Sequence, residues 1–145
     1  MSLEVDLGPE RNSFAESAEH ARRISLASPV LSQPKFQTIV ALGEEGFRSV
    51  VIDATYDPAE GNLRQALEAV CSSAEAVIRE GSNILVLSDR GIGDARVPLH
   101  SLLVTGAVHH HLIRCGLRAD CNLIVESASA RDSHHVACLL GFGAT

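Results

Sequence analysis

The 145-residue chain is poor in aromatic and basic residues, and these shortages exclude several classes of protein. Aromatic residues make up only 3% of the chain and tryptophan is absent, so stacking platforms for single-stranded nucleic acid are lacking. Twelve lysine and arginine residues face eighteen aspartate and glutamate residues, which gives a net charge of −6. Because nucleic-acid binders gather cations on one face, we expect no nucleic-acid partner.

Long apolar runs are also missing. The first residues, "MSLEVDLGPERN", contain no apolar segment of the signal-peptide type. No later window approaches the ~18 uninterrupted apolar residues of a membrane span. We therefore expect a cytoplasmic location and no membrane partner. The hydrophobic content of 46% is enough for one globular domain with a sizeable core.

The cysteines do not form a recognisable framework. The chain has four, Cys71, Cys115, Cys121 and Cys138, scattered over predicted helices, a helix end and a strand start, which favours reduced thiols. Cys115 and Cys121 make a C-x5-C spacing, but no third or fourth cysteine follows nearby to complete an iron–sulfur or zinc set.

Residues 1–48 differ in pattern from the rest of the chain. They carry three of the five prolines, at Pro9, Pro29 and Pro34, and only short apolar pieces, which predicts an extended arm. The spacing of apolar residues in "QPKFQTIVALG" predicts one short helix within this arm, ending at Gly43.

Residues 49–145 alternate regularly between strand and helix signals. Buried strands are predicted at "SVVIDATY", "NILVLSD" and "CNLIVES". Each strand precedes a helical pattern. We expect the first helix to be capped by Asn62 and closed by Gly81, the second to begin at Pro98 and stop at Gly116, and the third to be capped by Ser127 or Ser129 and stopped by Gly141.

Three successive strand–helix units predict an α/β protein with parallel strands joined by right-handed crossovers. They fit either an open sheet or an arc of a barrel. Three strands with helices on one side leave an apolar face and unpaired edges. We expect the arm of residues 1–48 to cover part of them, and a second copy or further domains to cover the rest.

The topology also predicts a cluster of charged groups. Each strand delivers a carboxylate near its carboxyl end, at Asp53, Asp89 and Glu126, and the ends of parallel strands meet at one rim. With Arg90 and Arg131 these acids would form either an acidic site or an ion-paired seam. The more common role of such residues is to cap a helix or shape a turn.

The histidine triplet 109–111 raises the question of a metal. Successive helical residues turn by about 100°, so three adjacent histidines cannot converge on one ion. Residues four apart do share a face, and two His/Cys pairs have that spacing. Helical histidines and cysteines are most often simply packed, so we expect no metal. Candidate ligands, if one binds, are His111, Cys115, His134 and Cys138.

Several stretches resemble one protein family. They are "GPERN", "HARRISLASPVLS", "NILVLSDRGI", "PLHSLLVTGAVHHHLIRCGLR" and "NLIVES", followed by the paired histidines and "LLGFGA". In this order, and over nearly the whole chain, they resemble the central domain of the glutamate synthase large subunit. The pattern "LLxxGAVHHHLIRxGLR" is the most specific part of the match.

The resemblance implies a parent enzyme that moves the amide nitrogen of glutamine onto 2-oxoglutarate and reduces the product to glutamate with electrons from ferredoxin or NADPH. In such enzymes a glutaminase domain with a terminal cysteine releases ammonia, and a barrel domain binds FMN and a 3Fe-4S cluster. The central domain links the two domains and binds no cofactor itself. A plastid stroma location is implied for a photosynthetic eukaryote.

The resemblance thus favours a segment that docks the glutaminase and FMN-binding domains and has no turnover of its own, since the chain begins with Met1 and Ser2 instead of a cysteine nucleophile. One alternative is a stand-alone small-molecule- or metal-binding α/β protein, which would form a homodimer or another homo-oligomer if its sheet needs a partner. The other is a compact enzyme that uses the acidic rim. In the parent enzyme that the resemblance implies, ammonia travels through a tunnel between the domains. Candidate residues for the interdomain contacts or the tunnel wall are Asp53, Asp89, Arg90, Glu126, His110, His134 and His135.

Overall fold

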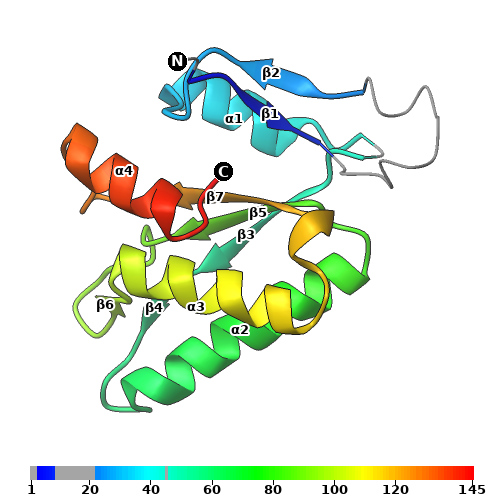
Figure 1. Ribbon diagram of the computed structural model, residues 1–145. Helices are drawn as coiled ribbons and strands as arrows, with labels where there is room; N and C mark the ends of the chain where they lie inside the picture. Colours follow the sequence, from blue (N-terminus) through cyan, green and yellow to red (C-terminus); the bar gives the residue numbers. More distant parts are fainter. Residues whose placement is uncertain (1–2, 9–21, 45) are drawn as a thin grey trace.

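The computed structural model describes residues 3–8, 22–44 and 46–145, which form a layered α/β structure (Figure 1). The elements in chain order are β1 (Val5–Leu7), β2 (Ile24–Leu26), α1 (Gln33–Ala41), β3 (Ser49–Asp53), β4 (Thr55–Tyr56), α2 (Leu63–Arg79), β5 (Ile84–Ser88), β6 (Val97–Pro98), α3 (Ser101–Arg114), the 3-10 turn η2 (Arg118–Asp120), β7 (Asn122–Glu126) and α4 (Ser133–Gly141).

The central sheet has the strand order β3-β5-β7, and all its pairs are parallel. This confirms the predicted α/β class with consecutive parallel units. The sheet is open and does not close as a barrel, so of the two predicted architectures the open sheet is the correct one. β3 and β7 are its edge strands.

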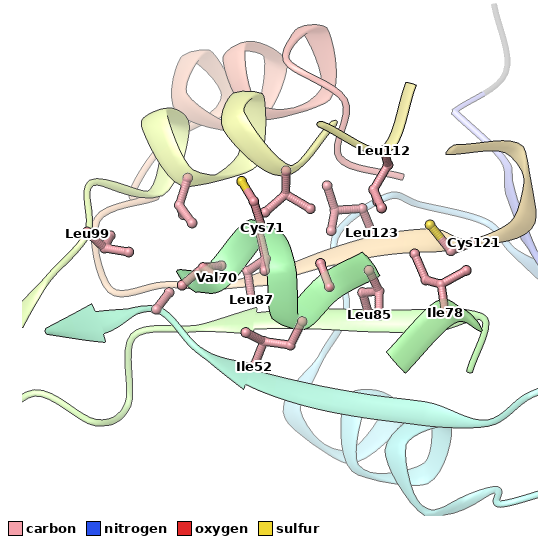
Figure 2. Close-up of a cluster of buried hydrophobic side chains, with 14 residues drawn as sticks. Ile52, Val70, Cys71, Ile78, Leu85, Leu87, Leu99, Leu112, Cys121 and Leu123 are labelled. Carbon is pink, nitrogen blue, oxygen red and sulfur yellow. The ribbon is translucent and has the colours of Figure 1, made fainter. Parts of the chain in front are cut away.

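The main core lies between the sheet and helices α2 and α3, which cover the same face (Figures 1 and 2). Alternate residues of the strands, such as Leu85, Leu87 and Leu123, point toward this face and are almost fully buried. They pack against Val70 and Leu112 from the two helices. Every residue of β5 is buried, as expected for the middle strand of a sheet with two covered faces.

The opposite face of the sheet has a second, smaller core. Ile84, Val86 and Ile124 point toward it and pack against Leu7 and Ile39. Leu7 belongs to an antiparallel pair of β1 and β2, and Ile39 to helix α1. The described residues of the N-terminal segment therefore form a layer over this face (Figure 1).

Two predicted element boundaries, the end of the first strand and the start of the second helix, were wrong because of a tertiary contact. Thr55 and Tyr56 do not continue β3 but pair antiparallel with β6, where Pro98 lies. Pro98 is therefore outside the second helix, which begins at Ser101.

The third helix is capped by Asp132, whose side chain accepts from the His135 N–H, and not by Ser127 or Ser129. It includes Gly141 as its last residue, and the chain turns at Gly143, where φ is +109°.

Helix α4 follows edge strand β7 and packs against α3 (Figure 1). After it, the chain returns to β7. The Thr145 N–H donates to the Leu123 carbonyl at 2.8 Å, and the Leu123 N–H donates to the Thr145 hydroxyl at 3.0 Å. These bonds place the described C-terminal residues along the outer edge of the sheet.

Candidate functional site

The carboxyl ends of the three parallel strands meet at one rim. Asp53, Ser88 and Glu126 are in register across β3, β5 and β7. Asp89 lies one residue beyond β5, and its N–H donates to the Glu126 carbonyl at 3.1 Å. The three acidic residues singled out from the sequence are thus neighbours.

Glu126 is bound by two residues from the end of β5. The Ser88 hydroxyl donates to Oε2 at 2.7 Å, and the Arg90 guanidinium pairs with Oε1. The Arg90 N–H also donates to the Ser88 hydroxyl at 3.3 Å. Both oxygens of the carboxylate are therefore occupied within the rim.

Asp89 organises the turn that follows β7. Its Oδ2 accepts from the Ser127 hydroxyl at 2.7 Å and from the Ala128 N–H at 3.0 Å. The hydroxyl of Ser127 lies 2.9 Å from that of Ser129, which lies 2.8 Å from that of Ser101. This chain of hydroxyls joins the rim to the first turn of α3, which explains why neither serine caps α4.

Asp53 has a partner that the sequence analysis missed. Its Oδ2 pairs with Arg96 at 2.8 Å, and its Oδ1 accepts from the hydroxyl of Thr55 at 2.8 Å. Arg96 also donates to the Thr55 carbonyl at 2.9 Å. The signal available in the sequence was the glycine-rich loop before Arg96. This loop passes close to Asp53, since a Cβ on Gly91 would lie 2.7 Å from Asp53 Oδ1.

These contacts correspond to the ion-paired seam, one of the two forms that the sequence allowed. The cations are Arg90 and Arg96. Arg131 does not join it: its guanidinium donates to the Ala128 carbonyl at 3.5 Å. A general base needs a carboxylate oxygen that faces substrate, whereas these carboxylates hold strands and loops together.

The three consecutive histidines of α3 have three different surroundings, as the 100° turn per residue requires. His109 packs against Gly143, and its Nδ1 accepts from Arg118 Nε at 3.0 Å. Burial, with a further contribution from the Arg118 charge, lowers the pKa of His109. His110 is exposed, and His111 turns toward α2.

His111 joins a cluster between α2 and α3. Its Nε2 lies 2.9 Å from Glu75 Oε2, and Cys115 Sγ lies 3.3 Å from that oxygen and 3.6 Å from Nε2. The other oxygen of Glu75 accepts from Arg79 Nε at 2.9 Å. Hydrogen bonds from Arg79, then His111 and Cys115, lower the pKa of Glu75 to about 2. Burial, followed by the hydrogen bond to Glu75, raises the pKa of Cys115.

Sequence reasoning found His111 and Cys115 but missed Glu75. Glu75 follows the fully buried Ala74 on α2 and lies one helical turn before Arg79. That position, beside the buried stripe of an amphipathic helix, was the available signal.

The second His/Cys pair lies apart from this cluster. On α4, Cys138 Sγ is 3.7 Å from His134 Nε2. His135 instead accepts from the Arg131 N–H at 3.2 Å. Over residues 3–8, 22–44 and 46–145, the one group of three potential ligands that converge is Glu75, His111 and Cys115. The four-residue ligand set considered from the sequence therefore does not assemble.

A family model described as the glutamate synthase central domain matches residues 1–145. The chain belongs to the glutamate synthase central domain family.

Several glutamate synthases are similar to this central domain. The chloroplastic ferredoxin-dependent enzyme of Oryza sativa is 35% identical over 150 aligned residues, which cover 100% of this chain and 9% of that protein. The NADH enzyme of Schizosaccharomyces pombe is 36% identical, with 99% and 7% covered. The large chain of the NADPH enzyme of Bacillus subtilis is 37% identical, with 95% and 9% covered. The chain thus spans less than a tenth of the length of these relatives.

The outer surface of the central domain has an apolar groove of about 650 Å³ between α2 and α3. Leu63 from α2, Leu103 from α3 and Phe142 from the end of α4 line it and are 43%, 44% and 50% exposed. His110 and His111 also line this groove. Exposed apolar patches rimmed by polar residues are typical of interaction sites.

A smaller cleft of about 310 Å³ lies beside β7, between α4 and the N-terminal layer. Ile124, Leu139 and Phe36 line it, together with Thr145. The central domain therefore has a second apolar opening, next to the edge of its sheet.

Among the described helices, none has the length and apolar character needed to cross a membrane.

Proposed function

We propose that this central domain is a non-catalytic connecting unit of a glutamate synthase large subunit, placed between the glutaminase domain and the FMN-binding domain. In this proposal the parent enzyme transfers the amide nitrogen of glutamine to 2-oxoglutarate. FMN and the 3Fe-4S cluster belong to the flavin domain. The central domain supplies docking surfaces, in the cytoplasm or the plastid stroma.

The observation that carries the proposal is the apolar groove between α2 and α3 in a chain matched over its full length by the central-domain family. Three large side chains that are nearly half exposed or more, Leu63, Leu103 and Phe142, gather in it. Burying such side chains against another domain is favourable at about 25 cal/mol per Å² of apolar surface. A neighbouring domain of the same subunit is the partner that the family membership favours.

The rim supports a structural role. Asp53, Asp89 and Glu126 each accept hydrogen bonds from side chains that fix neighbouring elements. Carboxylates that are occupied by such hydrogen bonds favour a structural role over proton transfer. The exposed part of this seam, with Arg90, stays a predicted contact surface, as do His110 in the groove and His134 and His135 on α4.

The proposal is tested in a large subunit that carries this segment, with Leu103→Asp in the groove. We expect glutamine-dependent glutamate formation to fall at least tenfold (~1.4 kcal/mol), because a charge in the interface separates the domains. Free ammonia, which bypasses the glutaminase, should restore much of the rate. The isolated chain, given glutamine, 2-oxoglutarate and a reductant, should form no glutamate.

The matched control is Ile113→Asp, on the same helix and 50% exposed but outside the groove. It should leave the glutamine-dependent rate near that of the unmodified subunit. Equal rates for Leu103→Asp and the unmodified subunit would reject docking through the groove.

A further inference from the structure

We propose that Glu75, His111 and Cys115 form a zinc-type metal site that joins α2 to α3. The positions of these three side chains support the site, and neither the docking role of the groove nor the family membership is needed for it. The cation would be a divalent transition metal held by one oxygen, one nitrogen and one sulfur ligand.

The first argument is that the three donor atoms converge on one point. In a catalytic Cys–His–carboxylate relay the imidazole uses one nitrogen toward the thiol and the other toward the carboxylate. Here the same atom, His111 Nε2, faces both Glu75 Oε2 and Cys115 Sγ, and Sγ also contacts Oε2 directly. A triangle of facing donor atoms fits a shared cation and does not fit a relay.

The second argument is the size of the triangle. Its edges are 2.9 Å between nitrogen and oxygen, 3.3 Å between sulfur and oxygen, and 3.6 Å between sulfur and nitrogen. Tetrahedral zinc with bonds of about 2.0 to 2.3 Å places its ligand atoms about 3.3 to 3.6 Å apart. The ligands therefore need to move by only a few tenths of an ångström to form one face of the tetrahedron.

The surroundings suit a cation with an open fourth position. Arg79 holds Oε1 of Glu75 and so leaves Oε2 for the metal, as an outer-shell partner does. The side chains of His111 and Glu75 are 24% and 28% exposed, which gives a water molecule access to the fourth position. One thiolate and one carboxylate balance the charge of the divalent ion, and the sulfur and nitrogen ligands favour zinc over magnesium or calcium.

Binding is a ligand exchange without redox change. The S–H bond of Cys115 breaks, its proton passes to solvent, and the sulfur electron pair binds the metal. His111 binds the ion through the lone pair of Nε2, so the proton that Nε2 donates to Glu75 without the metal moves through solvent to Nδ1. The cation replaces the hydrogen bonds that otherwise hold the three groups together.

Cobalt(II) is the probe, because its thiolate complex has a charge-transfer band in the near ultraviolet and zinc displaces it. The 145-residue chain, produced without a histidine tag, should show this band at one equivalent of cobalt. Cys115→Ser should abolish it. Glu75→Gln keeps the thiolate and imidazole, so the band should remain. Cobalt affinity should fall by more than the ~10-fold that loss of an outer-shell partner costs, because a ligand is lost.

The matched control is Cys138→Ser. Cys138 also lies four residues after a histidine, but no carboxylate joins that pair, so this variant should retain the full band. Circular dichroism of the metal-free variants is the check that each is folded. The proposal is overturned by the absence of a charge-transfer band at one equivalent, by a band that survives Cys115→Ser, or by unchanged affinity in Glu75→Gln. None of these results bears on the Leu103→Asp test of docking.

Discussion

At the residue scale, one arginine and one histidine fix the end of the described chain. Arg118 donates to the carbonyls of Cys121 and Gly143, both at 2.7 Å, and to His109. The His109 ring lies against Gly143, whose φ of +109° is one that residues with a side chain rarely adopt. The conformation of this turn therefore depends on glycine.

We predict that Gly143→Ala lowers the free energy of unfolding by at least about 2 kcal/mol, because the added Cβ would overlap the His109 ring and strain the backbone. Gly141→Ala is the control: a Cβ there meets nothing within 4 Å, so stability should stay within about 1 kcal/mol. Urea unfolding of both variants measures the difference. Equal stability would show that His109 does not restrict this turn.

We predict that the buried thiol of Cys121 makes the folded chain less stable in alkaline solution. Burial raises the pKa of its thiol from 9.0 to about 11. The unfolded chain therefore loses this proton first, so the stabilising contribution is complete below pH 9 and declines as pH rises toward 11. As the pH rises from about 8 to about 10, ionisation of this thiol should lower the free energy of unfolding by about 1 kcal/mol. Urea unfolding of Cys121→Ala should lack this part of the pH dependence, and an unchanged slope would contradict the assignment.

At the element scale, the cap of α4 shows how tertiary structure selects among local signals. Ser127, Ser129 and Asp132 are all residue types that cap helices. The serine hydroxyls bind Asp89 and each other, which leaves Asp132 to accept from the His135 N–H at 2.8 Å. That backbone bond holds the pKa of Asp132 below its usual range.

Asp132→Ala should therefore lower the free energy of unfolding by about 1 kcal/mol. Asp132→Asn keeps an oxygen that can accept the same bond, so it should retain most of the stability at neutral pH. Thermal melting of the two variants provides the comparison. Equal loss in both would mean that the charge of Asp132, and not its capping oxygen, stabilises the helix.

The rim gives a second prediction at this scale. Arg96 joins Asp53 on β3 to the carbonyl of Thr55 on β4, so Arg96→Ala should cost about 1 kcal/mol, a modest value because both charged groups are partly exposed. Arg131→Ala is matched in chemistry but removes only a long bond to Ala128. Its effect should stay within about 0.5 kcal/mol. Chemical denaturation distinguishes them, and a larger loss for Arg131 would contradict the arrangement of the seam.

The periodic elements of this chain were predictable and its tertiary contacts were not. β5 and α2 have strong local signals: β5 is an unbroken run of buried residues, and α2 begins at a capping box formed by Asn62 and Gln65. The β4–β6 pair involves only two residues on each side and depends on a loop folding back. Glu75 reaches His111, and Arg96 reaches Asp53, across long sequence separations, so the local patterns beside Glu75 and Arg96 could not identify these partners.

At the scale of the whole molecule, the central sheet is covered on both faces, and Thr145 is hydrogen-bonded along its β7 edge. Helices α2 and α3 cover one face, and α1 with β1 and β2 covers the other (Figure 1). The N-terminal layer thus covers the face that the βα units leave open. Among the described residues, the groove between α2 and α3 and the cleft beside β7 are apolar surfaces that stay open to solvent.

The central claim, that the groove between α2 and α3 is an interdomain surface, is tested most directly by hydroxyl-radical footprinting. The reagent oxidises exposed side chains, so the isolated chain should be labelled at Leu63, Leu103, Phe142 and Ile113. In the intact large subunit the three groove residues should be protected at least severalfold relative to Ile113. Equal oxidation of the groove in the isolated chain and in the intact subunit would contradict the account.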